Sequence, residues 1–178
     1  MRSSEHGAPP WLVWGLLGLG IVARLVPHPS NATPLLAIAL FSGTYLDRRV
    51  GLWLPLIAVA ISDIALGWHS TIPFTWGAFV LCGLLARRLR SHPSSGRILA
   101  TTLAGSLLFF VITNFGVWLV GGIYPRTGAG LMECFIAALP FFRNSLLGDL
   151  VYVTALFGLY ALATKAQPLP AYQPTKRT

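Results

Sequence analysis

Residues 98–120 read ILATTLAGSLLFFVITNFGVWLV, a run of 23 residues without a charged side chain. About 20 apolar residues are enough for an α-helix to cross the roughly 30 Å hydrocarbon layer of a membrane. Further apolar runs precede and follow this one along nearly the whole chain, and a soluble core could not bury all of them. The sequence therefore predicts an all-α protein whose solvent is the lipid bilayer.

The composition also favours a membrane protein. Of the 178 residues, 54% are hydrophobic and 10% are charged, whereas about 25% of the residues in a typical soluble domain are charged. The net charge of +8 does not indicate nucleic acid as a partner, because the basic residues fall in short loops and not on a separate basic face. Cys82 and Cys134 belong to segments that we place toward opposite membrane faces, so we expect no disulfide between them.

Prolines, glycines and charged turns divide the chain into six predicted transmembrane helices. Their predicted bounds are 11–26, 34–46, 50–67, 73–86, 98–120 and 145–164, with a short extra helical or re-entrant segment at 131–142. These helices form one predicted domain over 11–164, between a polar start at 1–10 and a polar tail at 165–178. Helices 34–46 and 73–86 are too short to cross upright. Either their ends are buried or line a cavity, or their bounds are drawn too tightly.

The basic residues predict the orientation of this bundle. Ten of them fall on one side of the six crossings, namely Arg2, Arg48, Arg49, Arg87, Arg88, Arg90, Arg97, Lys165, Lys176 and Arg177, and the opposite loops hold only Arg126 and Arg143. Lys and Arg collect on cytoplasmic loops. We therefore expect both termini to be cytoplasmic, in an inner (cytoplasmic) membrane.

The outer half has no net charge, because its three basic and three acidic residues cancel. These residues are Arg24, Arg126, Arg143, Asp63, Glu133 and Asp149. Isolated charges in lipid are costly, which predicts pairing. Asp63 lies near the C-terminal end of its helix, where the helix dipole disfavours a carboxylate, and Arg24 is its best candidate partner. The pair could equally be purely structural, and Arg24 could instead extend to the lipid headgroups.

The candidate binding residues are the polar and aromatic residues of this outer half. Arg24, His28, Asn31, Asp63, Asn114, Arg143, Asn144 and Asp149 are the candidates for polar lining or loop fixing, and Trp68, Trp118 and Tyr124 are the candidate apolar walls. Each has a plainer explanation: Asp149 would sit in the first turn of the last helix behind Asn144 and Ser145 as caps, and the aromatic residues would form an interfacial belt. The histidines have no zinc-ligand spacing, so we expect neither a metal nor a cofactor.

Several motifs together resemble a known family over residues 24–158. They are Pro27-His28-Pro29-Ser30-Asn31-Ala32-Thr33-Pro34, Ser62-Asp63 with Gly67, Thr113-Asn114-Phe115 with Trp118, Tyr124-Pro125, Pro140-Phe141-Phe142 with Asn144, and Gly148-Asp149. They resemble an uncharacterised bacterial family of proposed transport proteins. That family in turn is similar to the substrate-binding S components of energy-coupling-factor (ECF) transporters.

The resemblance implies a six-helix fold and a pocket closed by the outer loops, which captures a vitamin or similar micronutrient. It also implies a transmembrane coupling subunit and a pair of ATPases as partners, although some members act alone. The Ala-x-x-x-Ala motif by which S components dock on the coupling subunit is not present in residues 11–26.

The sequence therefore predicts transport of a small solute, by a substrate-binding subunit or a solitary carrier. The chain has no nucleotide-binding loop and no catalytic signature, so we do not expect it to be an enzyme. Two alternatives remain open. One is a membrane-embedded enzyme that uses Asp63 and Asp149 as an acid/base pair, and the other is a structural or assembly protein without a ligand, which the absence of a cavity between the helices would favour.

Overall fold

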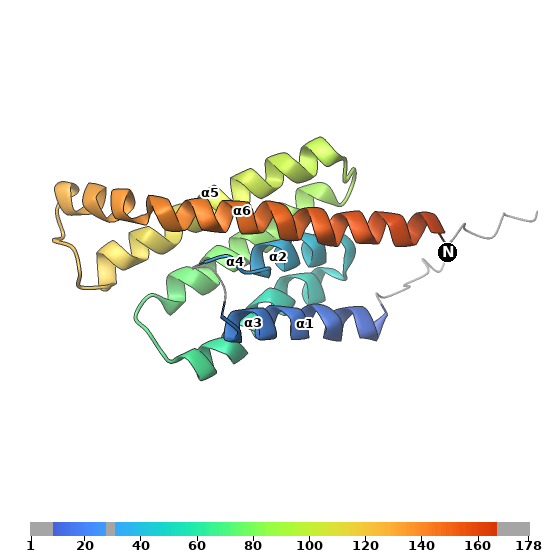
Figure 1. Ribbon diagram of the computed structural model, residues 1–178, viewed down its shortest axis with the longest axis horizontal. Coiled ribbons are helices and arrows are strands. Elements are labelled where there is room, and N and C mark those ends of the chain that lie inside the picture. The colour runs from blue at the N-terminus through green and yellow to red at the C-terminus, as the bar shows by residue number, and fades with distance from the viewer. Residues whose placement is uncertain (1–8, 28–30, 167–178) are drawn as a thin grey trace, which may run out of the picture.

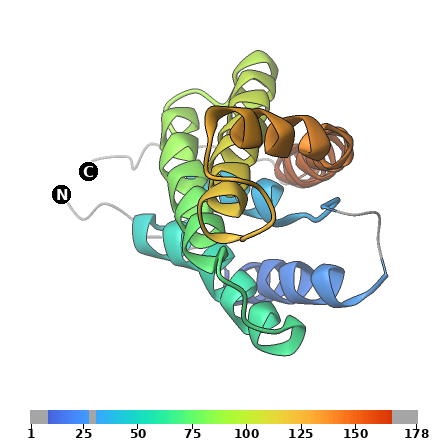
Figure 2. The ribbon, with the colours of Figure 1, turned by 90° about the vertical axis from the view of Figure 1, so that its left-hand side faces the viewer.

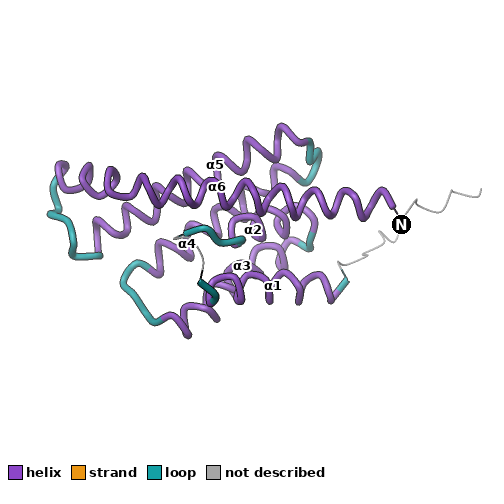
Figure 3. The backbone as a smooth tube through the Cα atoms, viewed as in Figure 1, coloured by secondary structure: helices purple, strands orange, loops and turns teal. Residues whose placement is uncertain are grey.

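The computed structural model describes residues 9–27 and 31–166, and this part of the chain contains helices and loops but no strand (Figures 1 and 3). The helices are α1 (Pro10–Leu25), α2 (Leu35–Tyr45), α3 (Arg48–Leu66), α4 (Ile72–Ala86), the 3₁₀ turn η1 (Arg87–Leu89), α5 (Ser95–Val120) and α6 (Gly128–Ala166). The predicted all-α class is therefore correct.

The helices alternate in direction, so that their connections fall at two opposite ends of the bundle. The α1–α2, α3–α4 and α5–α6 connections lie toward the left in Figure 1, whereas α1 begins and α6 ends on the right. We call the end with these three connections the cavity end, because the cavity described below opens there.

Four helical segments are long and apolar enough to cross a membrane, and they support a membrane location. They are Arg48–Leu66, Ile72–Leu89, Ser95–Val120 and Gly128–Thr164. The second of these joins α4 to η1, so the bounds 73–86 were too tight. Helices α1 and α2 are also apolar but have only 16 and 11 residues.

Helix α2 is the centre of the bundle. Every residue from Leu35 to Thr44 is buried, and α2 contacts each of the other five α-helices. A helix that is apolar on all sides is buried on all sides, which explains this position. At 1.5 Å per residue its 11 residues rise only about 16 Å, far less than a hydrocarbon layer. Other helices must therefore surround α2 and satisfy the polar groups at its ends.

Glycine and serine residues allow the neighbouring helices to approach α2 closely. The Ser42 hydroxyl donates a hydrogen bond to the Gly51 carbonyl of α3 (2.9 Å), and a Cβ on Gly51 would overlap the Ser42 carbonyl oxygen. On the other side, a Cβ on Gly43 would lie 2.7 Å from the Cβ of Ala86 and 2.9 Å from the carbonyl oxygen of Gly83 in α4. Small residues at such crossings are typical of helix packing in membranes.

The C-terminal end of α2 is closed by Arg90, which follows η1. The last carbonyl groups of a helix have no partner within it. Arg90 supplies the partners: its Nε donates to the Gly43 carbonyl (2.8 Å) and its Nη2 to the Leu46 carbonyl (2.6 Å). Sequence analysis treated Arg90 only as a topology-determining cation, and the structure gives it this second role.

The turn between α2 and α3 is held by Asp47. This residue precedes α3, and its carboxylate accepts a hydrogen bond from the backbone N–H of Arg49 (2.8 Å). The same bond lowers the pKa of the Asp47 carboxyl group, as expected of an acidic residue at a helix N-terminus. Asp47 therefore caps the start of α3 at Arg48, two residues before the predicted start at residue 50.

The predicted break before the last helix is wrong. The segments 131–142 and 145–164 form one helix, α6, with Pro140 inside it. Proline removes one helical hydrogen bond and kinks a helix, but a long helix can continue through it. Figure 2 views most of α6 end-on and shows its first turns running across the view, so the helix bends. Asn144 is therefore inside a helix and caps nothing, and Asp149 lies far from the helix start.

We expect Arg90→Ala to destabilise the protein, because it leaves the Gly43 and Leu46 carbonyls without a donor. A hydrogen bond to a charged group contributes about 2 kcal/mol. Because Arg90 is partly exposed to solvent, we expect its two bonds together to contribute about that amount. Thermal unfolding in detergent would measure it. Arg88→Ala, a change at an exposed neighbour, is the control, and equal losses in the two variants would contradict a capping role.

Gly51→Ala should disrupt the α2–α3 crossing, because the new methyl group meets the Ser42 backbone. Overpacking costs about 1–3 kcal/mol, and a backbone obstacle places this change at the upper end. Gly15→Ala makes the same substitution on α1, where a Cβ would meet nothing within 4 Å. We expect the Gly15 variant to unfold at or above the unfolding temperature of the wild type, and the Gly51 variant to unfold well below it. A Gly51 variant as stable as the wild type would refute the steric explanation.

Candidate functional site

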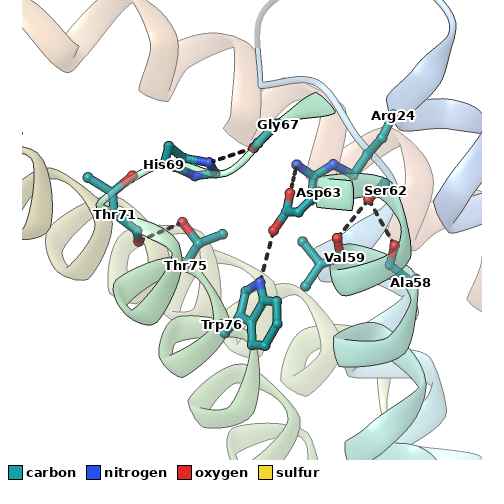
Figure 4. A network of polar contacts seen from close by, with 10 residues as sticks. All are labelled: Arg24, Ala58, Val59, Ser62, Asp63, Gly67, His69, Thr71, Thr75 and Trp76. Atoms are coloured by element: carbon teal, nitrogen blue, oxygen red, sulfur yellow. Dashed lines mark hydrogen bonds and ion pairs between the residues drawn. The ribbon is translucent and has the colours of Figure 1, made fainter. Parts of the chain in front are cut away.

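A buried ion pair lies at the cavity end of α3. The Nη2 atom of Arg24 is 2.7 Å from Oδ1 of Asp63, and the side chains are 15% and 1% exposed. Trp76 Nε1 donates to the other carboxylate oxygen, Oδ2, at 2.9 Å (Figure 4). The predicted pairing of Arg24 with Asp63 is confirmed. Residues of α1, α3 and α4 thus share one carboxylate, which links these helices.

The position of Asp63 explains why it needs two donors. It lies in the last turn of α3, and Gly67, whose φ of 101° favours glycine, ends the helix there. Both the negative helix end and the loss of water disfavour a carboxylate at this point. The guanidinium of Arg24 and the indole N–H of Trp76 offset these effects, so Asp63 is satisfied within the protein.

A cavity of about 360 Å³ lies beside this ion pair. All six α-helices and two of the connections at the cavity end contribute to its wall. The lining residues are Arg24, Asn31, Thr33, Leu35, Leu66, His69, Thr75, Phe79, Ser106, Phe109, Phe110, Thr113, Asn114, Val117, Phe141, Phe142 and Ser145. Leu35 is the first residue of α2, so the cavity lies at the N-terminal end of this short helix.

Helix α5 provides the longest part of the wall. Its lining residues, Ser106, Phe109, Phe110, Thr113, Asn114 and Val117, follow each other at intervals of three, one, three, one and three. This spacing places them on one face of a helix. Of this face, only Asn114 was among the predicted site residues. The periodic alternation of aromatic and small polar residues along 106–117 is the signal that could have identified the others.

Two polar side chains of this face bond to their own helix. The Thr113 hydroxyl donates to the Phe109 carbonyl and the Asn114 Nδ2 to the Phe110 carbonyl, both at 2.8 Å. Such bonds hold a side chain against the helix. They leave the Asn114 amide oxygen, an acceptor, for a guest in the cavity.

A second, more open cavity of about 420 Å³ adjoins the first. The two share Asn31, Asn114, Val117 and Phe141, and the second also has Ile123, Tyr124, Cys134, Ala137 and Ala138 in its wall. Trp118 Nε1 donates to the Pro125 carbonyl (3.0 Å) and so holds the α5–α6 connection. The second cavity therefore extends the first toward the end of the bundle.

Asn31 belongs to both cavities and is held in an unusual conformation. Its φ of 64° is in the left-handed region, which asparagine tolerates better than most residues. The Ser145 hydroxyl of α6 donates to the Asn31 carbonyl (3.1 Å), and the α-carbon of Ala32 would lie 3.1 Å from a Cβ on Gly148. The described part of the α1–α2 connection is thus docked on α6.

Asp149 lies one layer behind the wall, and its surroundings differ from those of Asp63. It is 6% exposed, and the Ser106 hydroxyl of α5 lies 2.7 Å from its Oδ2 atom. Within residues 9–27 and 31–166 it has no basic partner, since the ion pair of Arg24 and Asp63 is the one found there. Ser106, by contrast, reaches the cavity. The two acidic residues therefore bond to separate partners.

The structure separates the predicted site residues into three groups. Arg24, Asn31 and Asn114 line the first cavity and Tyr124 the second. Asp63 and Asp149 lie directly behind lining residues. Neither cavity includes Trp68, Trp118, Arg143 or Asn144, and Trp68 is 73% exposed. His28 lies outside the described residues.

The described residues offer no evident metal site. No three of their His, Cys, Asp and Glu side chains come together as ligands. Cys82 and Cys134 are free and buried, and each thiol faces a backbone carbonyl, of Gly105 at 3.6 Å and of Asn114 at 3.5 Å respectively.

Removal of Arg24 should cost stability because it leaves the Asp63 carboxylate buried without its cation. Breaking a buried pair from one side costs about 3 kcal/mol. We therefore expect Arg24→Met to lower the free energy of unfolding by about this amount. In an Asp63→Asn background, which keeps an acceptor for Trp76, Arg24→Met should lower it much less. Unfolding of the four proteins in detergent gives this double-mutant cycle, and additive losses would show that the pair contributes no coupling energy.

Comparison with known proteins places the chain in a family. No curated protein and no solved structure matches it. The profile of one family, described as a family of unknown function (DUF6580), matches residues 5–172. This match covers nearly the whole chain, including every helix and both cavities. The chain therefore belongs to the DUF6580 family, whose function is unknown.

Proposed function

We propose that this protein is a membrane carrier that captures a small solute in the cavity beside Arg24. The observation that carries the proposal is one cavity to which all six α-helices contribute. The absence of a cavity would have favoured a ligand-free structural protein, so the presence of one supports the carrier over that alternative.

The cavity wall suits a small, partly apolar solute with hydrogen-bonding groups. Its volume of about 360 Å³ is within the usual range of ligand sites, roughly 300–1,000 Å³. Phe79, Phe109, Phe110, Phe141 and Phe142 supply aromatic surface, on which a planar group can stack. Polar groups of Arg24, Asn31, His69, Thr75 and Asn114 lie around the same space and would fix its orientation.

The charge distribution favours an outward-facing cavity. Cationic loops at the opposite end would stay in the cytoplasm, which leaves the cavity end outside an inner membrane. The solute would then enter between the α1–α2, α3–α4 and α5–α6 connections and be enclosed beneath them. Exposure to the cytoplasm requires a movement of helices around the fixed core of α2.

The partners that we propose follow from the resemblance to S components of ECF transporters. In one form the chain would work with a transmembrane coupling subunit and two ATPases, and in the other it would act alone. It contains no nucleotide-binding loop of its own. Uptake into vesicles that contain the chain alone, with and without a partner ATPase module and ATP, distinguishes these forms.

We expect the purified protein to retain its solute, and Asn114→Leu to lose it. Native mass spectrometry of the protein from mild detergent would detect the bound mass. Loss of one hydrogen bond to a buried ligand group costs about 1.4 kcal/mol or more, a tenfold loss of affinity. Asn144→Leu is the matched control, because Asn144 is half-buried on α6 but lines neither cavity.

Circular dichroism and gel filtration would show that both variants fold. Equal solute occupancy in the Asn114 and Asn144 variants would contradict binding in this cavity. A wild-type protein that binds no mass under any lysate condition, and no candidate solute on titration, would contradict the carrier function itself.

A further inference from the structure

We infer that Asp149 is a proton-binding site that Ser106 connects to the cavity, so that the resting protein holds a neutral carboxylic acid in the middle of α6. The inference begins from a contrast between two buried acids. Asp63 has a guanidinium and an indole N–H as donors. Asp149 has one hydroxyl, that of Ser106.

The single hydrogen atom of the Ser106 hydroxyl favours a protonated Asp149. The Ser106 Oγ atom lies 2.7 Å from Asp149 Oδ2 and 3.0 Å from the Thr102 carbonyl oxygen. Both distances are those of hydrogen bonds, but a serine hydroxyl carries a single hydrogen. If Asp149 were ionised, both neighbours of Ser106 would be acceptors, and one of the two contacts would lack a proton. If Asp149 is protonated, it donates to Ser106, and Ser106 donates to Thr102.

Burial favours the same state. Asp149, Ser106 and Thr102 are 6%, 2% and 0% exposed, and a carboxylate in such surroundings is costly unless a cation or several donors stabilise it. A neutral acid avoids this cost and satisfies Ser106 and the Thr102 carbonyl together.

Among residues 9–27 and 31–166, the charged and titratable groups around Asp149 supply no compensating cation. On α4 the nearest titratable group is the Cys82 thiol, which would also repel a negative charge if ionised. Helix α5 has one basic residue, Arg97, nine positions before Ser106, and α2 has none. On α6 itself the nearest charged residue is Arg143, which is exposed and, six residues earlier, lies on a different face of the helix.

Ser106 gives the proton a connection to the cavity. This residue lines the cavity and bonds to Asp149. Release of the proton would turn the Ser106 hydrogen from Thr102 toward Asp149 and place a negative charge next to the solute. Binding of solute and binding of the proton are therefore linked, and this part of the inference rests on the proposed function. Linkage of this kind is reciprocal.

Infrared spectroscopy of the purified, solute-free protein tests the protonation directly. The chain has five Asp and Glu residues, so the C=O stretching band of a protonated carboxyl group can be assigned by substitution. At neutral pH we expect this band in the wild type and in Asp63→Asn, and its loss in Asp149→Asn. The amide N–H of asparagine can donate to Ser106 as the protonated acid would, and Ser106 can still donate to Thr102, so the variant should fold. Ser106→Ala should keep the band but shift its frequency, because the acid loses its hydrogen-bond acceptor.

A wild-type spectrum without the band at neutral pH, or a band that persists in Asp149→Asn, would overturn the inference. Neither result depends on a solute, so the test stands apart from the carrier proposal. With a solute identified, affinity should vary with pH in the wild type and lose this variation in Asp149→Asn; unchanged variation would refute the linkage.

Discussion

A helix of 11 residues that is buried on every side imposes the main constraint on this structure. Helix α2 is too short to reach both surfaces of a membrane, and its backbone ends cannot be left without partners in lipid. The protein solves this differently at the two ends. Arg90 reaches under the C-terminal end and bonds to two of its carbonyl groups. At the N-terminal end Leu35, the first residue of α2, lines the cavity. The cavity thus lies beyond the N-terminal end of this short helix.

The two buried aspartates show how surroundings give one residue type two roles. Asp63 is paired with a cation and an indole N–H, and this arrangement links three helices beside the cavity. Asp149 has only a hydroxyl that is itself bonded to a carbonyl. The first is suited to hold the wall in place. The second is suited to gain and lose a proton, because no fixed charge determines its state.

Helix α6 connects these features along its length. Its first part lines the second cavity, its middle holds the α1–α2 connection through Ser145, and Asp149 follows one turn later. A break at 143–144 would have separated these positions. The helix instead continues through Pro140, so one element carries the second cavity wall, the contact with the α1–α2 connection and Asp149.

The residues themselves determined the class of the protein and the members of its main ion pair. Apolar runs predict membrane helices whatever their packing, and an acid such as Asp63 at a helix end requires a cation, of which the outer half offers few. Helix starts and ends were predicted within about three residues, except at 143–144, where the predicted break is absent and α6 continues from its bend at Pro140. Proline permits either a kink or a break, so the sequence alone did not decide between them. The cavity could not be predicted in full, because its wall combines residues from all six helices. The sequence contained a signal for the α5 face, in the spacing of Ser106 to Val117, but which helix faces meet depends on the crossings that Gly43 and Gly51 permit. Tertiary structure alone decided that, within the described part of the chain, Asp149 has a hydroxyl and no cation as its neighbour, since that depends on which turn of α5 lies against α6.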